Sequence, residues 1–481
     1  MKRYDAYING QLVSPKGGYS TVTNPATGEQ VYEVANCGAS EVNAAINAAY
    51  DAQKAWSKRP IMQRGDILRR FGQILLDHVD ELALILSTEQ GKTLEQSKGE
   101  ITGAVGLLEY QAGWDRKLEG EILPGDNNSK ENILIMKEPI GVVACIMPWN
   151  FPIYVLLRKI VPALLVGCTV VCKPSSDTPA STLAMAALVK EAGFPDGVVN
   201  LIAGHGSVVG GAIASNPKVS MITVTGSVET GEEIVRQSAN NLCKVSLELG
   251  GKAPSIVMKD ADLELAADCV VGARLNNAGQ VCNCAERLYV QEEIAEQFTE
   301  MVRVRMAKAT FGDGVKDPGL TMGALINRAA AERIQGIVDR AVAAGARVIL
   351  GGKPVEGPGA FYPPTILTNV RQDAEVVQKE TFGPVLPVLT FKTVEEALAL
   401  ANDCEYGLTS SLYTNDYNTV MLFANNIEFG ELYVNRQQGE AYQGYHAGWK
   451  HSGIGGDDGK HGIEEFLKMR TVYLDYQTNL Y

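Results

Sequence analysis

The chain has 481 residues, of which 46% are hydrophobic and 21% are charged, a composition that excludes wholesale disorder. Its 56 acidic and 43 basic residues give a formal net charge of −13 without any basic block, which argues against a protein that binds nucleic acid or anionic membranes. Because the length exceeds the roughly 250–300 residues at which one hydrophobic core stops growing, we expect at least two domains.

The cysteines and the apolar stretches indicate a cytoplasmic protein without a membrane span. The nine cysteines are an odd number, and several lie in apolar runs, which favours a reduced, intracellular chain. The start, MKRYDAYINGQ, lacks the apolar segment of a secretory signal. The longest apolar stretch, 160–172, contains Pro162 and Gly167 and is shorter than the roughly 18–20 residues that cross a membrane.

The first 140 residues predict helices followed by one isolated strand. Apolar residues recur at helical spacing through 40–118, for example at Ile67, Phe71 and Leu75. Residues 133–136 (ILIM) are a short strand candidate between polar stretches, and the tail has another at 471–474 (TVYL). We expect these two strands to form a small separate sheet that contacts another subunit.

Residues 140–258 alternate between strand and helix candidates. The clearest predicted helix is 180–192, with Thr178 as N-cap, Pro179 at the first helical position and Gly193 at its end. A second alternating block follows at 285–434, with helices predicted at 293–309, 327–345 and 394–402. Such alternation predicts βαβ units and parallel sheets. The strand candidates of the first block are 141–147, 168–172, 198–202, 219–224 and 245–249.

Six short motifs contain the residue types of a catalytic and nucleotide-binding site. Each is weak alone, because a short string of glycines and a cysteine arises by chance. The motifs are PWNFP at 148–152, KPSS at 173–176, TGSVETG at 225–231, LELGGK at 247–252, NAGQVC at 277–282 and ETFGP at 380–384. In this order and spacing they closely resemble the aldehyde dehydrogenase superfamily, and the resemblance extends from NPATG at 24–28 to SGIG at 452–455.

This resemblance implies a mixed α/β fold with three parts. A doubly wound, Rossmann-like cofactor domain would comprise residues 1–118 and 141–250, with 435–464 returning to it. A second α/β domain, the catalytic domain, would comprise residues 251–434. Residues 119–140 and 465–481 would form an oligomerisation sheet, and the family suggests a homodimer or a homotetramer.

The resemblance also implies the catalytic residues, and their chemistry agrees. Cys282 would attack the aldehyde carbon, because a thiol adds to a carbonyl and then survives as a thioester. Glu248 would act as general base, and its presence points to a thioester that water hydrolyses to the free acid. Asn150 would stabilise the oxyanion together with the backbone N–H of Cys282. Cys284 makes a Cys-x-Cys pair with Cys282, but no further ligand lies at metal-binding spacing, so no metal is expected.

A nicotinamide dinucleotide site follows from the same resemblance. The small residues at 226–231 would admit a pyrophosphate to a helix N-terminus, where free N–H groups favour anions. Many NAD-using relatives have a glutamate where this chain has Ser176, and a carboxylate there would repel the 2′-phosphate of NADP. We therefore expect the use of both NADP and NAD, with a preference for NADP. The candidate cofactor residues are Met147, Pro148, Trp149, Lys173, Ser175, Ser176, Gly226, Ser227, Gly231, Leu249, Glu380 and Phe382.

The candidate substrate residues are Arg158, Glu440 and His446, in segments most similar to bacterial lactaldehyde and glycolaldehyde dehydrogenases. They would form a polar mouth for a short aldehyde with an α-hydroxyl, because unpaired buried donors penalise an alkyl analogue. Alternatively, Arg158 pairs with a nearby acid and His446 caps a loop, or Arg158 binds the carboxylate of succinate semialdehyde. Two other classes stay open: a catalytically silent structural protein that binds the cofactor, and a thiol esterase that uses Cys282 and Glu248 alone.

Overall fold

The computed structural model describes residues 1–126 and 130–476. Helices occupy most of 40–118, as the apolar spacing predicted. In this described part of the chain no helix combines the length and the apolar character of a membrane span. The first elements are β1 (Lys2–Tyr4), β2 (Ala6–Ile8), β3 (Gln11–Val13), β4 (Tyr19–Thr23), β5 (Gln30–Ala35), α1 (Ala39–Lys58), α2 (Ile61–Asp77), α3 (Val79–Gln90), α4 (Leu94–Ala112) and the 3₁₀ turn η1 (Gly113–Arg116).

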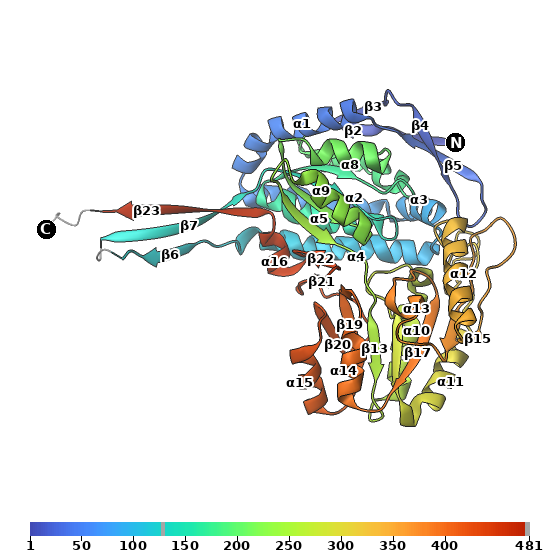
Figure 1. Cartoon of the computed structure of the whole chain (residues 1–481). Helices are drawn as coiled ribbons and strands as arrows, with labels where there is room; N and C mark the ends of the chain where they lie inside the picture. Colours follow the sequence, from blue (N-terminus) through green and yellow to red (C-terminus); the bar gives the residue numbers. More distant parts are fainter. Residues whose placement is uncertain (127–129, 477–481) are drawn as a thin grey trace.

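An eight-stranded sheet, in the order β22-β12-β11-β8-β9-β10-β2-β3, lies in the upper body of Figure 1. Its five central strands are parallel and are the five predicted for the first block. The strand order reverses direction between β8 and β11, so the sheet is doubly wound, as expected. These strands are β8 (Val142–Ile146), β9 (Thr169–Lys173), β10 (Val199–Leu201), β11 (Val219–Thr225) and β12 (Lys244–Glu248), and β22 (Gly453–Ile454) pairs antiparallel at the edge.

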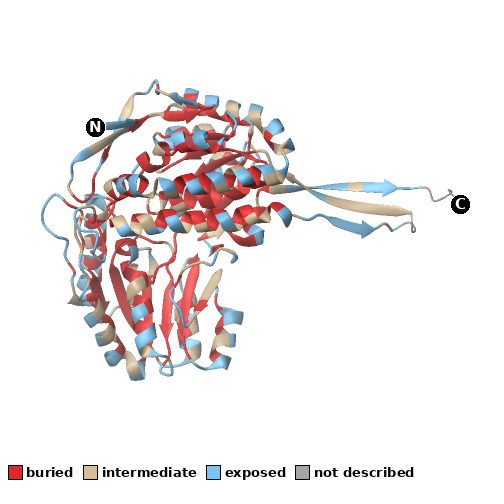
Figure 2. Cartoon of the chain, turned by 180° about the vertical axis from the view of Figure 1, so that it is seen from behind, coloured by how far each residue is buried: buried red, intermediate tan, exposed pale blue. Residues whose placement is uncertain are grey.

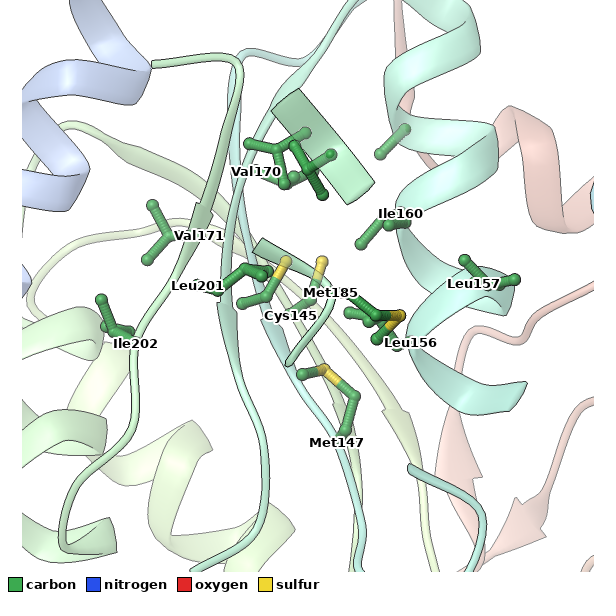
Figure 3. Packing of buried hydrophobic residues seen from close by; sticks show 14 of the residues in the cluster. Cys145, Met147, Leu156, Leu157, Ile160, Val170, Val171, Met185, Leu201 and Ile202 are labelled. Atoms are coloured by element: carbon green, nitrogen blue, oxygen red, sulfur yellow. The ribbon is translucent and has the colours of Figure 1, made fainter. Parts of the chain in front are cut away.

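Helices pack on this sheet through a continuous apolar core. The helix α5 (Pro152–Val166) is almost wholly buried, and Figure 3 shows its Leu156 and Ile160 facing Cys145 of β8 and Val170 of β9. This burial fixes the start of α5 beside the end of β8, where the PWNFP motif lies. The other helices are α6 (Ala180–Ala184), α7 (Ala186–Ala192), α8 (Gly206–Ala214), α9 (Val228–Ser238) and, later in the chain, α16 (Gly459–Glu464).

A second sheet of seven strands, in the order β15-β16-β17-β14-β13-β19-β20, forms the lower body of Figure 1. All its pairs are parallel except the edge strand β15, and it surrounds a second hydrophobic core built from residues 256–429. The helices predicted at 293–309, 327–345 and 394–402 are confirmed. The elements are β13 (Pro254–Val257), α10 (Leu263–Leu275), η2 (Asn276–Gly279), β14 (Arg287–Gln291), η3 (Glu292–Ile294), α11 (Ala295–Met306), α12 (Arg328–Ala343), β15 (Arg347–Leu350), β16 (Thr365–Thr368), α13 (Glu375–Gln378), β17 (Val385–Phe391), α14 (Val394–Asn402), β18 (Tyr406–Gly407), β19 (Thr409–Tyr413), α15 (Tyr417–Asn426), β20 (Glu431–Val434) and β21 (Trp449–Lys450).

A three-stranded antiparallel arm extends from the upper body (Figures 1 and 2). Its strands are β6 (Glu121–Pro124), β7 (Glu131–Pro139) and β23 (Leu467–Asp475), and Val472 pairs with Leu134. The predicted pairing of 133–136 with 471–474 is therefore confirmed. Large apolar side chains on the arm are exposed, with Ile122 at 75% and Met469 at 70% of their surface. Of the segments expected to form this sheet, residues 127–129 and 477–481 lie outside the described residues.

The predicted N-cap of the helix at 180–192 is wrong. The helix is interrupted at Met185, and its N-terminal residue is Ala180 rather than Pro179. The Thr178 hydroxyl donates to the carbonyl of Trp149 (3.3 Å) instead of capping the helix. The N–H groups of Ala180 and Ser181 donate to the Glu89 carboxylate at the end of α3, at 2.7 and 2.9 Å. A buried acid from a distant helix thus takes the role that a local hydroxyl usually has.

Candidate active site

The loops after β8 and β11 leave the sheet at the point where its strand order reverses. In open α/β sheets ligands bind at this crevice, beyond the carboxyl ends of the strands. Met147 to Asn150 follow β8, and Gly226 and Ser227 follow β11. The Ser227 side chain caps α9 by accepting from the N–H of Thr230 (3.3 Å), and Ser227, Glu229 and Thr230 at this end of the helix are exposed.

Two glycines bring separate segments close together because they have no side chain. A Cβ added to Gly231 would lie 2.7 Å from the side chain of Leu249, so the start of α9 packs directly on the segment after β12. A Cβ added to Gly251 would lie 2.5 Å from the carbonyl oxygen of Cys282. The glycine pair after Glu248 therefore allows the end of β12 to contact the nucleophile loop, which we define as residues 276–285.

The nucleophile loop is held in an unusual backbone conformation. Asn277 and Ala278 have φ values of 46° and 54°, in the left-handed region that non-glycine residues rarely adopt. The buried guanidinium of Arg274 donates to the carbonyls of Gly279 (2.6 Å) and Ala285 (2.9 Å), one on each side of Cys282. Cys282 itself is partly exposed, and burial of its sulfur raises the pKa of the thiol while His446 lowers it.

Glu248 ends β12 with a buried carboxylate that has no hydrogen-bond partner among the described residues. Its Oε2 lies 3.6 Å from Nε2 of His446. Burial raises the pKa of Glu248 to about 8, against the lowering effect of His446. A buried acid without a hydrogen bond, with His446 as its nearest cation, is suited to hold and release a proton near neutral pH.

Asn150 is fixed at both its backbone and its side chain. Its carbonyl accepts from Nζ of Lys92 (2.6 Å) and from Nδ2 of Asn277 (3.3 Å). Its side-chain amide donates to the carbonyl of Gln280 (3.0 Å), in the nucleophile loop. The amide that we predicted as an oxyanion donor therefore lies against the loop that carries Cys282.

The sequence reasoning missed the buried ion pair that holds this asparagine. Nζ of Lys92 lies 2.6 Å from Oε2 of Glu100, and neither side chain is exposed. Oε1 of Glu100 accepts from the N–H groups of Ile153 (2.9 Å) and Tyr154 (3.1 Å), in the first turn of α5. The pair thus joins α4, the PWNFP loop and α5. A buried charge appears in a sequence only as a polar residue, so no pattern pointed to it.

Replacing Lys92 with methionine should lower the free energy of unfolding by about 3–5 kcal/mol, because Glu100 would be left buried without its cation. Urea unfolding checks this, and adding Glu100→Gln to Lys92→Met should restore part of the loss. Lys98→Met is the control, since Lys98 is a partly exposed lysine that pairs with the exposed Asp80, and its loss should cost under about 1 kcal/mol. Equal losses for the two lysine variants would contradict the role of the pair.

The candidate cofactor residues surround the same crevice. The buried ammonium of Lys173, at the end of β9, donates to the Pro174 carbonyl (2.9 Å), and burial lowers its pKa to about 8. The exposed hydroxyl of Ser176 donates to the carbonyl of Gly204 (3.3 Å). Asp177 is exposed and bonds to Ser175, so its carboxylate adjoins this position.

Glu380 and Phe382 belong to the lower body, in the segment between α13 and β17. Oε1 of Glu380 accepts from the N–H of Gly251 (3.0 Å), and burial raises the pKa of this acid to about 7. The rings of Phe382 and Trp149 are 5.2 Å apart, edge to face. Met147, which follows β8, is buried in the apolar core of the upper body (Figure 3). A buried ammonium, an exposed helix N-terminus and an aromatic pair fit the phosphates and the ring of a nicotinamide dinucleotide.

The candidate substrate residues are brought together beside Cys282. The amide of Asn283, its neighbour in sequence, donates to Oε1 of Glu440 (2.9 Å). Nδ1 of His446 lies 3.3 Å from Glu440 and 2.5 Å from Glu431, a residue that the sequence reasoning missed. The carboxylates keep the pKa of His446 well above its usual value despite burial.

Arg158 pairs with an acid, as the alternative interpretation expected. Its Nη2 lies 2.7 Å from the buried carboxylate of Asp458 and 3.9 Å from Glu440. Two carboxylates therefore balance this single positive charge. This arrangement weakens the attraction of the pocket for an anionic substrate.

Cys284 is buried and donates to the carbonyl of Val281 at 2.9 Å. Within residues 1–126 and 130–476 no group of three or more histidine, cysteine or acidic side chains has the arrangement of a metal site.

Comparison with known proteins agrees with this geometry. Residues 12–472 match the model of the aldehyde dehydrogenase family. The chain is 47% identical to lactaldehyde dehydrogenase of Escherichia coli, over 98% of each chain. It is 40% identical to a succinate-semialdehyde dehydrogenase [NADP(+)] of the same species, over 97% of each. A crystal structure of the E. coli lactaldehyde dehydrogenase aligns with a TM-score of 0.96, covering 98% of this chain and 99% of that one.

The chain therefore belongs to the aldehyde dehydrogenase family. It is an oxidoreductase of a family that uses NAD(P), and its mixed α/β fold is that of the solved aldehyde dehydrogenases.

Proposed function

We propose that this protein oxidises short hydroxyaldehydes, such as lactaldehyde or glycolaldehyde, to their carboxylic acids with NADP or NAD. The observation that carries the proposal is the meeting of three distant segments at one point. Asn150 bonds to the nucleophile loop, Gly251 contacts the Cys282 carbonyl, and the Glu248 carboxylate, which has no hydrogen bond in the structure, lies at the end of the same strand segment.

In this proposal Cys282 is the nucleophile. Its thiol loses its proton to solvent as the sulfur bonds to the aldehyde carbon, and the oxygen that gains negative charge accepts from the Asn150 amide and from the N–H of Cys282. The C–H bond then breaks as the hydride leaves, the carbon–oxygen double bond re-forms, and the product is a thioester. A nicotinamide cofactor, when bound, supplies the acceptor for the hydride. Glu248 then takes a proton from a water molecule that attacks the resulting thioester, and the carbon–sulfur bond breaks to release the acid. Cys282 regains its thiol form.

The charge balance at Arg158 supports a neutral, hydroxylated aldehyde over succinate semialdehyde. Asp458 and Glu440 already neutralise the guanidinium, whereas Glu440, His446 and Asn283 offer hydrogen bonds to an α-hydroxyl. The 47% identity to a lactaldehyde dehydrogenase points the same way.

The test of this specificity compares kcat/KM for lactaldehyde with that for propionaldehyde, which lacks only the hydroxyl. We expect lactaldehyde to be favoured by about 10²-fold or more, because the buried polar atoms of Arg158 and Glu248 that have no hydrogen bond in the structure would stay without one beside the alkyl analogue. Glu440→Gln should reduce this ratio. A preference for propionaldehyde, or a higher kcat/KM for succinate semialdehyde, would refute the assignment.

The cofactor preference is proposed to be for NADP, with NAD also used. Serine at position 176 offers a hydroxyl where a glutamate carboxylate would repel the 2′-phosphate. The cation of Lys173 offsets the neighbouring carboxylate of Asp177, which bonds to Ser175. Ser176→Glu should therefore raise the Kd of NADP by about tenfold or more and leave that of NAD within a few-fold. Quenching of tryptophan fluorescence measures both constants. An unchanged Kd for NADP would contradict this placement of the phosphate.

We also propose that the chain forms a homodimer or a homotetramer in the cytoplasm. The exposed apolar side chains of the arm support self-association through β6, β7 and β23. A cytoplasmic location suits a thiol nucleophile, because this compartment keeps cysteines reduced.

A further inference from the structure

Glu286 is a fully buried acid four residues after Cys282, and no step proposed above uses it. Four donor groups lie against its carboxylate. Oε2 accepts from Nζ of Lys252 (2.6 Å) and the N–H of Thr381 (3.1 Å). Oε1 accepts from the N–H of Phe382 (3.2 Å) and forms an ion pair with Nη1 of Arg274 (2.9 Å). Each oxygen of this carboxylate thus has one cation and one backbone N–H beside it.

These four donors come from three separate parts of the site. Lys252 directly follows the Glu248–Gly251 segment at the end of β12. Arg274 holds the carbonyls on both sides of Cys282, in the nucleophile loop. The two backbone N–H groups belong to Thr381 and Phe382, in the segment 380–382 that carries the candidate cofactor residues Glu380 and Phe382. One carboxylate therefore joins three segments: the residues that follow Glu248, the nucleophile loop, and residues 380–382, which we call the cofactor segment.

The cofactor segment needs such support because its backbone is strained. Phe382 has a φ of 51°, in the left-handed region that disfavours residues with a side chain. Lys252 adds a second contact by donating to the hydroxyl of Thr381 (3.0 Å). Burial alone would raise the pKa of Glu286, but the charges of Lys252 and Arg274 lower it to about 2, so the carboxylate stays charged at neutral pH.

We infer that Glu286 is a positioning residue that holds the 380–382 segment against the nucleophile loop. It sets the distance between the group bound at Glu380 and Phe382 and the sulfur of Cys282. Small displacements of reacting groups cost large factors in rate, so a single buried carboxylate at this junction controls the geometry of hydride transfer. This inference rests on the roles proposed for Cys282, Glu380 and Phe382.

The variant that tests this is Glu286→Gln, which keeps the shape and removes the charge. We expect the Kd of NADP, measured by tryptophan fluorescence, to rise by about tenfold or more, and kcat for glycolaldehyde to fall by about 10²-fold. The kinetic isotope effect on kcat with glycolaldehyde deuterated at C1 should increase, because hydride transfer would become slower than the other steps. Alkylation of Cys282 by iodoacetamide should stay within a few-fold of the wild-type rate.

Asp115→Asn is the matched control. Asp115 is also a buried acid paired with an arginine (2.5 Å), but Asp115 belongs to η1 and its partner Arg69 to α2, away from the candidate site. The Asp115→Asn variant should lower the unfolding midpoint and leave the Kd of NADP and the isotope effect unchanged. If Glu286→Gln does not fold, Glu286→Asp keeps the charge, shortens the side chain and should show the same direction of change.

A Glu286 variant with a wild-type Kd and a wild-type isotope effect would overturn the inference and leave this acid as a support of the fold alone. Wild-type protein that binds neither NADP nor NAD would instead refute the proposed cofactor site, and the inference with it.

Discussion

Cys282→Ala should abolish the oxidation of glycolaldehyde, lowering kcat on the order of 10⁴–10⁶-fold, because the thioester route requires the sulfur. The absorbance of reduced cofactor measures turnover. Binding of NADP should stay within a few-fold of wild type, since the contacts proposed for the dinucleotide lie on other residues.

Cys284→Ala provides the matched control for this loss. Cys284 lies two residues away in the same loop, and its buried thiol donates to the backbone carbonyls of Gly279 and Val281. It should keep most of the activity. Substantial turnover by Cys282→Ala would refute the assignment of the nucleophile and with it the proposed reaction.

Glu248→Gln should stall the enzyme after the hydride has left. Without a base to activate water, we expect steady-state turnover to fall by about 10²–10⁴-fold, while a burst of about one reduced cofactor per active site persists. Stopped-flow absorbance resolves the burst from the slow phase.

The pH dependence gives this prediction a second readout. Burial raises the pKa of Glu248 to about 8, so the carboxylate is mostly protonated at pH 7 and gains its basic form as the pH rises. Wild-type turnover limited by hydrolysis should therefore increase through about pH 8 and level off above it, and Glu248→Gln should lose this rise. Glu89→Gln is the control, because Glu89 is a buried acid with a pKa of about 7 that caps α6 instead of facing the nucleophile. An unchanged profile in Glu248→Gln would exclude this acid as the base.

The first sheet and part of the arm were predictable because local patterns encode them, whereas Cys282 was predicted as the nucleophile only through the resemblance to a family. Short β-branched runs alternating with amphipathic windows predicted the five parallel strands of the first sheet. Two isolated apolar tetrapeptides predicted β7 and β23 of the arm. The glycines after Glu248 were visible as a motif, and their role as points of close backbone approach follows from the missing side chain alone.

The buried charges were not predictable in the same way. Lys92, Glu100 and Glu286 lie in segments where a charged residue ordinarily marks a solvent-facing position, and only the tertiary fold brings their partners to them. The prediction that Thr178 caps α6 failed for the same reason. The group that accepts from the first N–H groups of the helix is the carboxylate of Glu89, 91 residues before Ala180. The ion-pair partner of Arg158 is Asp458, which is far from it in the sequence and is brought close only by the tertiary fold.

The most direct test of the account is the mass of Glu248→Gln after incubation with glycolaldehyde and NADP. Acid quenching followed by peptide mass spectrometry should find a glycolyl group bound to the peptide that contains Cys282, and wild-type protein should show little of it. An unmodified Cys282 peptide in a variant that still reduces one equivalent of NADP, or an acyl group on any other residue, would contradict the proposed chemistry.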